Sequence, residues 1–446
     1  MIVGSRGRKY HGHSTKRVKG LIVACACVAV ALAGWSASAQ VPLGWSAAGT
    51  VDSSTTPFAD PAIATDGAGN WVTIFSSNSG GADDEILVQT SSDNGVTWST
   101  AVPLNTNAGV DVDDDSTPSL ATNGTDWVAA WQAAGMIQMA TSTDAGATWS
   151  APAALGAGLS PSVAVNSGPV VAFVNPAGDV AISPSAATIP DGSAGSPAVA
   201  TDGGTTFVVA YESGADIGVA TSTDGGATFS APMTFDSGGL DAGPSAGFDP
   251  AVGTWIVGWN TDTGISVVVS ADGGATWSPP LEILTVSATT DAIAAATDGS
   301  GNWTLIFAQA GADSDIIFST SDDSGLTWSD LRFIADTATN DGNPAIATGS
   351  GQWIAVWDAV GALETLVHMA TAVTTTTLLL GGGGDDGPCF IASAAYGTPM
   401  AKDIEVLRRM RDTYLMNNAL GMFFVDAYYS ISPAIADQVA QHPWAA

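Results

Sequence analysis

Basic residues are scarce in this chain of 446 residues, which has 11 Lys and Arg against 43 Asp and Glu and a formal net charge of −32 at pH 7. Six of the 11 lie within the first nineteen residues, so the rest of the chain holds five. Nucleic-acid phosphates and anionic lipid headgroups are bound through clustered Lys and Arg. The scarcity therefore excludes nucleic acid as a partner and also a lipid surface held through charge.

Cysteine is also scarce, with three residues in the chain. No apolar run after residue 35 is long enough to cross a bilayer. Residues 1–39 contain no acid and carry a basic start, an apolar run from Leu21 to Trp35, and Ala37-Ser38-Ala39 before Gln40. This pattern predicts a secretory signal peptide; the alternative is a membrane anchor, for which the run is short. Cleavage leaves Cys389 alone, so we expect an exported chain, secreted or held in the cell envelope, without an internal disulfide.

An eight-residue repeat, Ser-x-Asp-x-Gly-x-Thr-Trp, occupies the middle of the chain, with Phe in place of Trp in its third copy. The wide gap before that copy leaves room for a decayed unit, in which residues 180–185 keep a strand-like pattern and lose the turn. Repeats of this length indicate a repetitive architecture. The Asp residues of the five copies are Asp93, Asp144, Asp224, Asp272 and Asp323.

Two aromatic residues four positions apart precede each copy, and a sixth such pair lies in the last unit. Positions i and i+4 of a strand share a face, so each pair forms a stripe on one side of a sheet. We interpret the stripes as core packing rather than as a ligand cage. The pairs are Trp71/Phe75, Trp127/Trp131, Phe207/Tyr211, Trp255/Trp259, Trp303/Phe307 and Trp353/Trp357, and the decayed unit keeps Phe173.

Each unit is predicted to contain four strands, with the repeat as the turn between the third and the fourth. In the first unit these are residues 62–64, 71–75, 86–90 and 99–104. Four-stranded repeats indicate an all-β fold, a β-propeller. Seven third strands can be counted, which predicts seven blades; six is the alternative if the decayed unit does not form a full blade.

The last unit ends near Val373 without a repeat turn or a fourth strand. The segment from Trp45 to Asp52 matches the fourth strand that runs from Phe229 to Asp236. We therefore expect the N-terminal strand to close the last blade, which removes an open sheet edge.

The repeat resembles the Asp-box, or BNR repeat, of the sialidase superfamily, over roughly residues 41–373. In such a turn the Asp accepts backbone N–H groups, the Gly takes a positive φ and the Trp packs beside the sheet. The resemblance implies that these turns lie on the face opposite the binding funnel. The five Asp residues are therefore expected to be structural and to take no part in catalysis.

Enzymes of this superfamily bind the carboxylate of sialic acid with three Arg residues, and they use a Tyr–Glu nucleophile pair and an Asp acid/base. Between Gln40 and Val373 this chain has one Arg, Arg332, and no Lys. One Arg cannot form the triad, and neutral groups do not replace bidentate carboxylate recognition. Tyr211-Glu212 is tempting as a nucleophile pair, but adjacent strand residues face opposite sides. Sialidase activity is therefore not expected.

Acidic residues gather in the loops that are expected to surround the funnel. We interpret them as a solvated rim; the alternatives are a catalytic carboxylate pair or a Ca²⁺ site, since Ca²⁺ prefers oxygen ligands. Residues 111–115 are the best candidate for calcium, although they lack the spacing of an EF-hand. The rim residues are Asp83, Asp84, Glu85, Asp111, Asp113, Asp114 and Asp115, followed later in the chain by Glu212, Asp216, Asp262, Asp313, Asp315 and Asp341.

The composition changes after the propeller. Residues 374–388, rich in Thr and Gly, predict a linker. Residues 389–446 begin Cys389-Phe390-Ile391 and continue with three predicted helices. They resemble the CFI-box C-terminal domain of exported bacterial proteins, which is thought to act in sorting or anchoring. Cys389 is either a processing or attachment site or a buried small residue.

Taken together, these patterns predict an exported bacterial propeller that binds a glycan or a surface protein on its acidic face. A membrane is involved only through the C-terminal domain, if at all, and we expect a monomer. The alternative is a glycoside hydrolase or polysaccharide lyase that uses two funnel carboxylates. A third is a purely architectural surface protein.

Overall fold

The structure is a computed structural model that describes residues 45–46, 49–50, 58–78, 83–106, 112–285, 293–309, 314–335, 340–360 and 365–373. Within these ranges it contains strands and turns, and no helix long and apolar enough to cross a membrane. The strands form seven four-stranded antiparallel sheets. The predicted signal peptide, the predicted linker and the C-terminal segment with Cys389 lie outside the described residues, as do Asp111 and Asp313.

Six of the sheets each use four consecutive strands of the chain. Sheets 1 to 3 comprise β2 (Phe58–Thr65), β3 (Trp71–Ser77), β4 (Glu85–Ser91) and β5 (Val102–Pro103); β6 (Asp115–Thr122), β7 (Trp127–Ala133), β8 (Met136–Ser142) and β9 (Ala153–Ala157); and β10 (Leu159–Val165), β11 (Pro169–Val174), β12 (Val180–Ser183) and β13 (Ala187–Ile189). Sheets 4 to 6 comprise β14 (Ala194–Thr201), β15 (Phe207–Ser213), β16 (Asp216–Ser222) and β17 (Met233–Phe235); β18 (Ala242–Asp249), β19 (Thr254–Thr261), β20 (Gly264–Ser270) and β21 (Leu281–Thr285); and β22 (Ile293–Thr297), β23 (Trp303–Gln309), β24 (Asp315–Ser321) and β25 (Arg332–Ala335).

Sheet 7 joins the two ends of the propeller. It is built from β26 (Asn340–Gly349), β27 (Gln352–Val360) and β28 (Thr365–Val373), and its fourth strand is β1 (Gly49–Thr50). Gly49 pairs with Met369 and Thr50 with His368. Trp45 packs edge to face on Phe318 of sheet 6, with ring centroids 5.9 Å apart. The prediction that the N-terminal segment supplies the missing strand agrees with this pairing.

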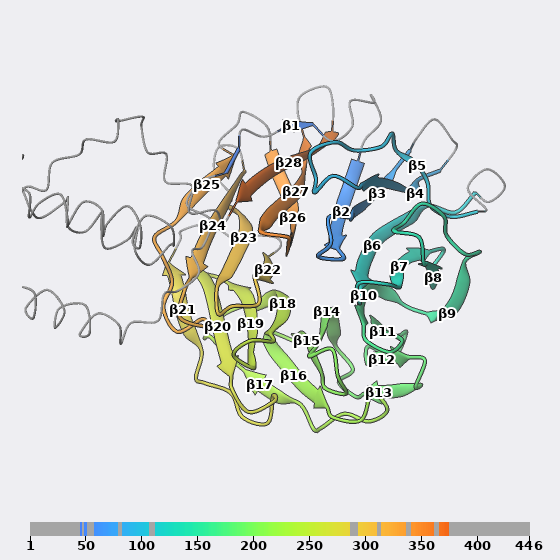
Figure 1. Ribbon diagram of the computed structural model, residues 1–446. Coiled ribbons are helices and arrows are strands. Elements are labelled where there is room, and N and C mark those ends of the chain that lie inside the picture. The colour runs from blue at the N-terminus through green and yellow to red at the C-terminus, as the bar shows by residue number, and fades with distance from the viewer. Residues whose placement is uncertain are drawn as a thin grey trace, which may run out of the picture. The chain divides into compact units, whose positions relative to one another are not determined.

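The sheets are arranged as a β-propeller. Their first strands gather around the centre and their fourth strands lie at the outside (Figure 1). The first strands contact one another in the circuit β2, β6, β10, β14, β18, β22, β26 and back to β2. Serine side chains link several of them: the Oγ of Ser119 accepts the N–H of Val163 at 3.1 Å, and the Oγ of Ser162 accepts the N–H of Val199 at 3.0 Å.

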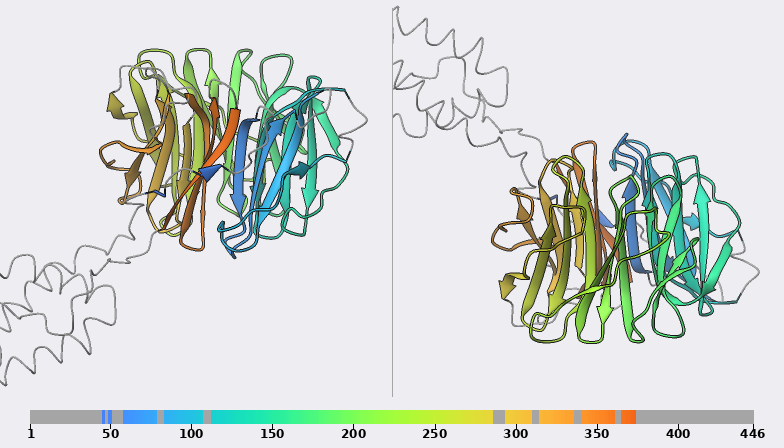
Figure 2. Two further views of the ribbon diagram at one scale, coloured as in Figure 1. Left: turned by 90° about the horizontal axis from the view of Figure 1, so that it is seen from above. Right: turned by 90° about the horizontal axis from the view of Figure 1, so that it is seen from below.

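The antiparallel order gives the ring two different faces, seen edge-on in Figure 2. We call one the box face, because the turns between third and fourth strands, such as residues 92–98, lie there. We call the other the hairpin face. It carries the turns between second and third strands and the connections from one sheet to the next, because every fourth strand runs back to it.

The aromatic stripes form the core, as predicted. All twelve residues of the six pairs are at most 1% exposed, and Phe173 of the decayed unit is 5% exposed. Each stripe packs between neighbouring sheets; Trp127 and Trp131 of β7, for example, lie in one cluster with Val72 and Ile74 of β3. The sheets are therefore held together by apolar packing between their faces.

Two sequence predictions were wrong in detail. The fourth strand of sheet 1 was expected over residues 99–104 and pairs only over Val102–Pro103. The reason is that the box turn and the Ser99 contact to Thr90 take up the preceding residues. Glu212 was expected in a loop, but it lies within β15, where it pairs with Ile217.

Candidate functional site

The five box turns share one hydrogen-bond pattern. In sheet 1, Oδ1 of Asp93 accepts the backbone N–H of Thr97 at 2.8 Å and Oδ2 accepts its hydroxyl at 2.6 Å. Ser91 donates to the Asp93 carboxylate at 2.8 Å and accepts the N–H of Gly95 at 3.0 Å. The Trp98 indole donates to the Gly95 carbonyl at 3.2 Å, a bond that recurs in three other turns but not in that of sheet 4, where Phe229 replaces the Trp. Both carboxylate oxygens of the Asp therefore accept hydrogen bonds inside its own turn.

These hydrogen bonds stabilise the ionised carboxylate. The Thr hydroxyl, the Thr backbone N–H and the Ser hydroxyl lower the pKa of Asp93, Asp144 and Asp224 to about 2. The pKa of Asp272 is lowered for the same reasons. The pKa of Asp323 is also lowered: partial burial opposes the shift, but hydrogen bonds from Thr327 and Ser321 outweigh it. A general acid at neutral pH needs the opposite shift, so these groups are unsuited to that role.

A second repeated feature surrounds the centre of the hairpin face. In six of the seven first strands, the residue before a proline lies in the left-handed region at a β-bulge. Each proline is buried and each preceding residue is at least partly exposed. The preceding residues, with their φ values, are Asp60 (51°), Thr117 (48°), Ser160 (51°), Ser196 (38°), Gly243 (57°) and Asn343 (44°).

We call these six residues the bulge ring. A left-handed φ is costly for any residue with a side chain, and most of all for β-branched Thr117. Bulges re-aim side chains and are frequent beside functional sites, where backbone strain is often stored. The ring thus places polar groups, none of them basic, at the innermost strands of the hairpin face.

Two carboxylates meet at this ring. Burial raises the pKa of Asp60, and it also raises the pKa of Asp358, which is 6% exposed at the end of β27. The charge of Asp60 adds to the shift of Asp358, so the two groups lie within electrostatic reach of each other. Asn343 of the ring donates its amide to Oδ2 of Asp358 at 2.9 Å. A carboxyl group with a raised pKa can hold a proton nearer to neutral pH than an ordinary one.

The acids predicted to form a solvated rim do not behave as one class. Asp113 and Asp114 are exposed, but Asp83 is 7%, Glu85 6% and Asp115 1% exposed. The reason is that Asn105, itself 3% exposed, donates its amide to Oε2 of Glu85 at 2.8 Å and to Oδ2 of Asp115 at 3.0 Å. A neutral amide therefore bridges two buried acids at the junction of sheets 1 and 2, and the prediction of a solvated rim was wrong for this trio.

Of the remaining rim acids, Asp84 is half-buried. Its backbone N–H donates to Oδ1 of Asp114 at 3.2 Å. Burial raises the pKa of Asp84, and the charges of Asp114 and Asp83 raise it further. Asp262 is exposed and accepts the N–H of Leu240 at 3.1 Å, while Asp341 is 1% exposed at the start of the first strand of sheet 7.

The residues compared with a sialidase active site, Arg332 and the pair Tyr211-Glu212, lie on different sheets. Arg332 is exposed on β25, the outermost strand of sheet 6. Tyr211 is fully buried, and burial together with the charge of Asp191 raises its pKa to about 12. The Tyr211 ring lies so close to Gly218 that a Cβ there would approach its Cζ to 2.5 Å. Tyr211 is therefore a core residue, and the Tyr211-Glu212 pair is not placed to attack a ligand.

Comparisons with known proteins give only distant structural likenesses at low sequence identity. No protein-family profile matches the chain, and no curated protein matches its sequence. Among solved structures, it is similar to a protein of unknown function from Dyadobacter fermentans, with 13% identity and a TM-score of 0.49 over 75% of this chain and 99% of that one. It is similar to Trypanosoma rangeli sialidase, with 13% identity and a TM-score of 0.45, over 81% of this chain and 58% of that one. A leech intramolecular trans-sialidase matches at 12% identity and a TM-score of 0.45, over 73% of this chain and 69% of that one.

The bulge ring and the Asp60–Asp358 pair were missed by the sequence analysis, although a signal for the ring was present. An X-Pro dipeptide lies near the start of the first strand of six units: residues 60–61, 117–118, 160–161, 196–197, 243–244 and 343–344. Asp358 directly follows the aromatic pair Trp353/Trp357. Its approach to Asp60 depends on ring closure, which no local pattern indicates.

Proposed function

We propose that this chain is an exported, non-catalytic propeller that binds a neutral glycan or a surface protein through its hairpin face. The observation that carries the proposal is the bulge ring. Five of its six residues, all except Gly243, present hydroxyl, amide or carboxyl groups around one centre. The left-handed φ is costly for Thr117, Ser160 and Ser196, and strain of this kind is typically retained for function. Glycan hydroxyls pair with such neutral and acidic polar groups, and binding sites lie on loops carried by a rigid scaffold.

The contrast between the two faces supports this choice. The box face repeats one turn five times, and its acids are used within each turn. The hairpin face varies from sheet to sheet and holds Asp60, Thr117, Asn343 and Asp358 near its centre. The single Arg of the propeller lies on an outer strand, so recognition of an anionic sugar has no basic partner there.

The proposal includes the architecture around this face. The seven sheets are taken as seven blades of an Asp-box propeller spanning residues 40–373, in which Asp93, Asp144, Asp224, Asp272 and Asp323 have a structural role. Residues 1–39 act as a signal peptide, 374–388 as a linker and 389–446 as a CFI-box domain that holds the protein at the cell surface, with Cys389 as its attachment or processing residue. The protein is a monomer. Calcium at Asp83, Asp84, Glu85 and residues 111–115 is a weaker proposal, because Asn105 already bridges two of these acids.

The test is a binding and turnover screen of the full chain against neutral and acidic polysaccharides and surface proteins. The variant Thr117→Val/Ser160→Ala/Ser196→Ala removes three hydroxyls of the bulge ring. We expect at least about a tenfold loss of affinity, since each lost hydrogen bond contributes about 0.5–1.5 kcal/mol. The matched control, Thr143→Val/Thr223→Val, removes two exposed hydroxyls of the box face and should bind normally. Release of sialic acid, or equal binding by both variants, contradicts the proposal.

A glycoside hydrolase or lyase is the second candidate, and one observation favours it. Asp60 and Asp358 both have raised pKa values and interact through their charges, as an acid and base pair requires. If this candidate holds, Asp60→Asn and Asp358→Asn should each abolish turnover of a neutral polysaccharide while leaving its binding intact. Binding without turnover by the unmodified chain excludes it.

A further inference from the structure

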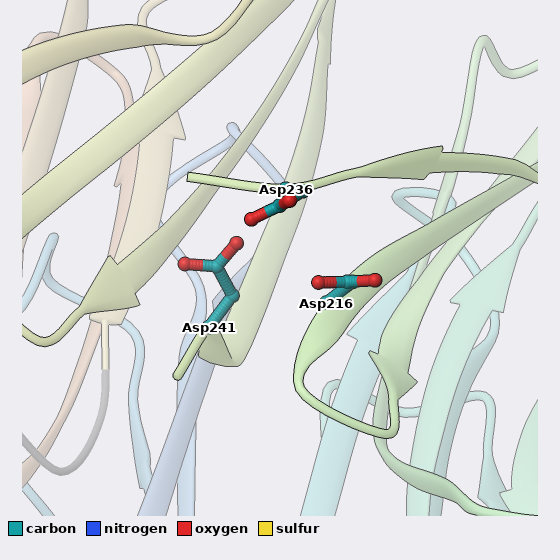
Figure 3. Close-up of side chains that lie close together, drawn as sticks. All are labelled: Asp216, Asp236 and Asp241. Carbon is teal, nitrogen blue, oxygen red and sulfur yellow. The ribbon is translucent and has the colours of Figure 1, made fainter. Parts of the chain in front are cut away.

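Three carboxylates converge at the junction of sheets 4 and 5 on the hairpin face (Figure 3). Asp216 begins β16, Asp236 follows β17, and Asp241 directly precedes β18. One carboxylate oxygen from each lies within 4.8 Å of the other two. No Lys or Arg can balance them, because the propeller holds only Arg332, on sheet 6.

Asp241 is the informative member of this trio. It is fully buried, and its Oδ2 accepts the N–H of Ser237 at 2.9 Å, while its Oδ1 is buried without a hydrogen-bond partner. Figure 3 shows one oxygen of the Asp241 carboxylate directed toward Asp236 and Asp216, and the other directed away from them. An unpaired carboxylate oxygen in such a position is costly unless a cation or a donor reaches it.

At the equivalent junction of sheets 1 and 2 an amide side chain stands in place of the third acid, although the Oδ1 of that amide, Asn105, is also buried without a hydrogen-bond partner. Glu85 begins β4 as Asp216 begins β16, and the N–H of Asp115 donates to the hairpin carbonyl of Asp84 as that of Asp241 donates to Ala215. By strand register, Asn105 occupies the position of Asp236. Asn105 donates to both neighbouring acids, whereas a carboxylate at that position has no proton to donate.

We propose that Asp216, Asp236 and Asp241 bind one Ca²⁺ ion, which takes the place that the Asn105 amide holds between the acids of sheets 1 and 2. Calcium accepts carboxylate oxygens in flexible geometry and completes its shell with water. Asp236 is exposed, which gives the ion and its waters a route from solvent. With three protein carboxylates we expect a dissociation constant of about 10⁻⁴–10⁻³ M, as in other extracellular calcium modules.

The test compares the full chain with two variants, after the metal has been removed with a chelator. Equilibrium dialysis with radioactive calcium should give one ion per chain for the unmodified protein. Asp236→Asn converts the trio to the Asn-bridged form and should lose binding at least about tenfold. It should also make the melting temperature independent of calcium, whereas that of the unmodified chain rises by roughly 5 °C at one hundred times the dissociation constant.

The matched control is Asp330→Asn, which removes an exposed carboxylate just before β25 of sheet 6, outside both acidic clusters. It should bind calcium like the unmodified chain. Asp216→Asn provides a second variant of the proposed site, so that a folding defect in one variant does not decide the result. Absence of binding by the unmodified chain, equal binding by Asp236→Asn, or loss of binding in Asp330→Asn alone overturns the proposal.

Discussion

Gly95 of sheet 1 lies directly against Ile354 of sheet 7, so that a Cβ at Gly95 would overlap the Cδ1 of Ile354. The same contact recurs around the ring: a Cβ at Gly146 would lie 2.8 Å from Cγ2 of Val72 on the preceding sheet. The box glycine therefore has two roles. It provides the positive φ of its turn, and it lets the turn approach the second strand of the neighbouring sheet.

This contact predicts that Gly95→Ala destabilises the ring closure. A left-handed alanine costs about 1–2 kcal/mol, and overpacking against the fully buried Ile354 adds about 1–3 kcal/mol. The control is Gly225→Ala, since Gly225 has a similar φ of 79° and nothing within 4 Å of an added Cβ. Alanine already stands at the equivalent position of sheet 2 as Ala145, with φ 57°. Urea unfolding should show a clearly larger loss for Gly95→Ala, and equal losses would refute the packing role.

Asn105 predicts a second effect on stability. Replacing it with Leu removes the donor shared by Glu85 and Asp115, and we expect a loss of about 2–4 kcal/mol in the free energy of unfolding. Asn78→Leu, at a half-buried asparagine near the same face, serves as the control and should cost less than about 1 kcal/mol. A neutral result for Asn105→Leu would mean that the two acids do not depend on the bridge.

The sequence predicts structural features whose residues lie close together in the chain better than it predicts contacts between sheets. Each box turn and each aromatic stripe lies within about ten consecutive residues, so the positions of Asp93 and Trp71 could be predicted from spacing alone. The burial of Asp115 could not, because its partner Asn105 shows no pattern and the pair forms only when two sheets meet. Asp60 and Asp358 come together only when sheet 1 and sheet 7 close the ring.

The Asp60–Asp358 pair also predicts how stability changes between neutral pH and pH 4. Both carboxyl groups have a raised pKa in the folded state, so above about pH 4 each of them binds more protons in the folded chain than in the unfolded chain. Lowering the pH from 7 should therefore raise the melting temperature, measured in the presence of a chelator. Asp60→Asn, which tolerates the left-handed φ, should reduce this rise. If the substitution leaves the dependence of melting temperature on pH unchanged, Asp60 does not contribute to that dependence.

Below about pH 4 the box turns have the opposite effect, because their contribution to stability decreases as the pH falls. The folded pKa of Asp144 is lowered to about 2, against an ordinary value of 3.8, so the unfolded chain binds more protons between these values. The stability from the turn is complete above about pH 4 and is lost as the pH falls toward 2. Thr148→Val removes the side-chain hydrogen bond that contributes most to the shift, and the pKa of Asp144 should rise toward 3.8. An NMR titration of the Asp144 carboxyl carbon checks this. The neighbouring Thr143→Val, exposed and outside the Asp144 hydrogen bonds, should leave the pKa at about 2, and an equal shift in both variants would exclude the Thr148 hydroxyl as the cause.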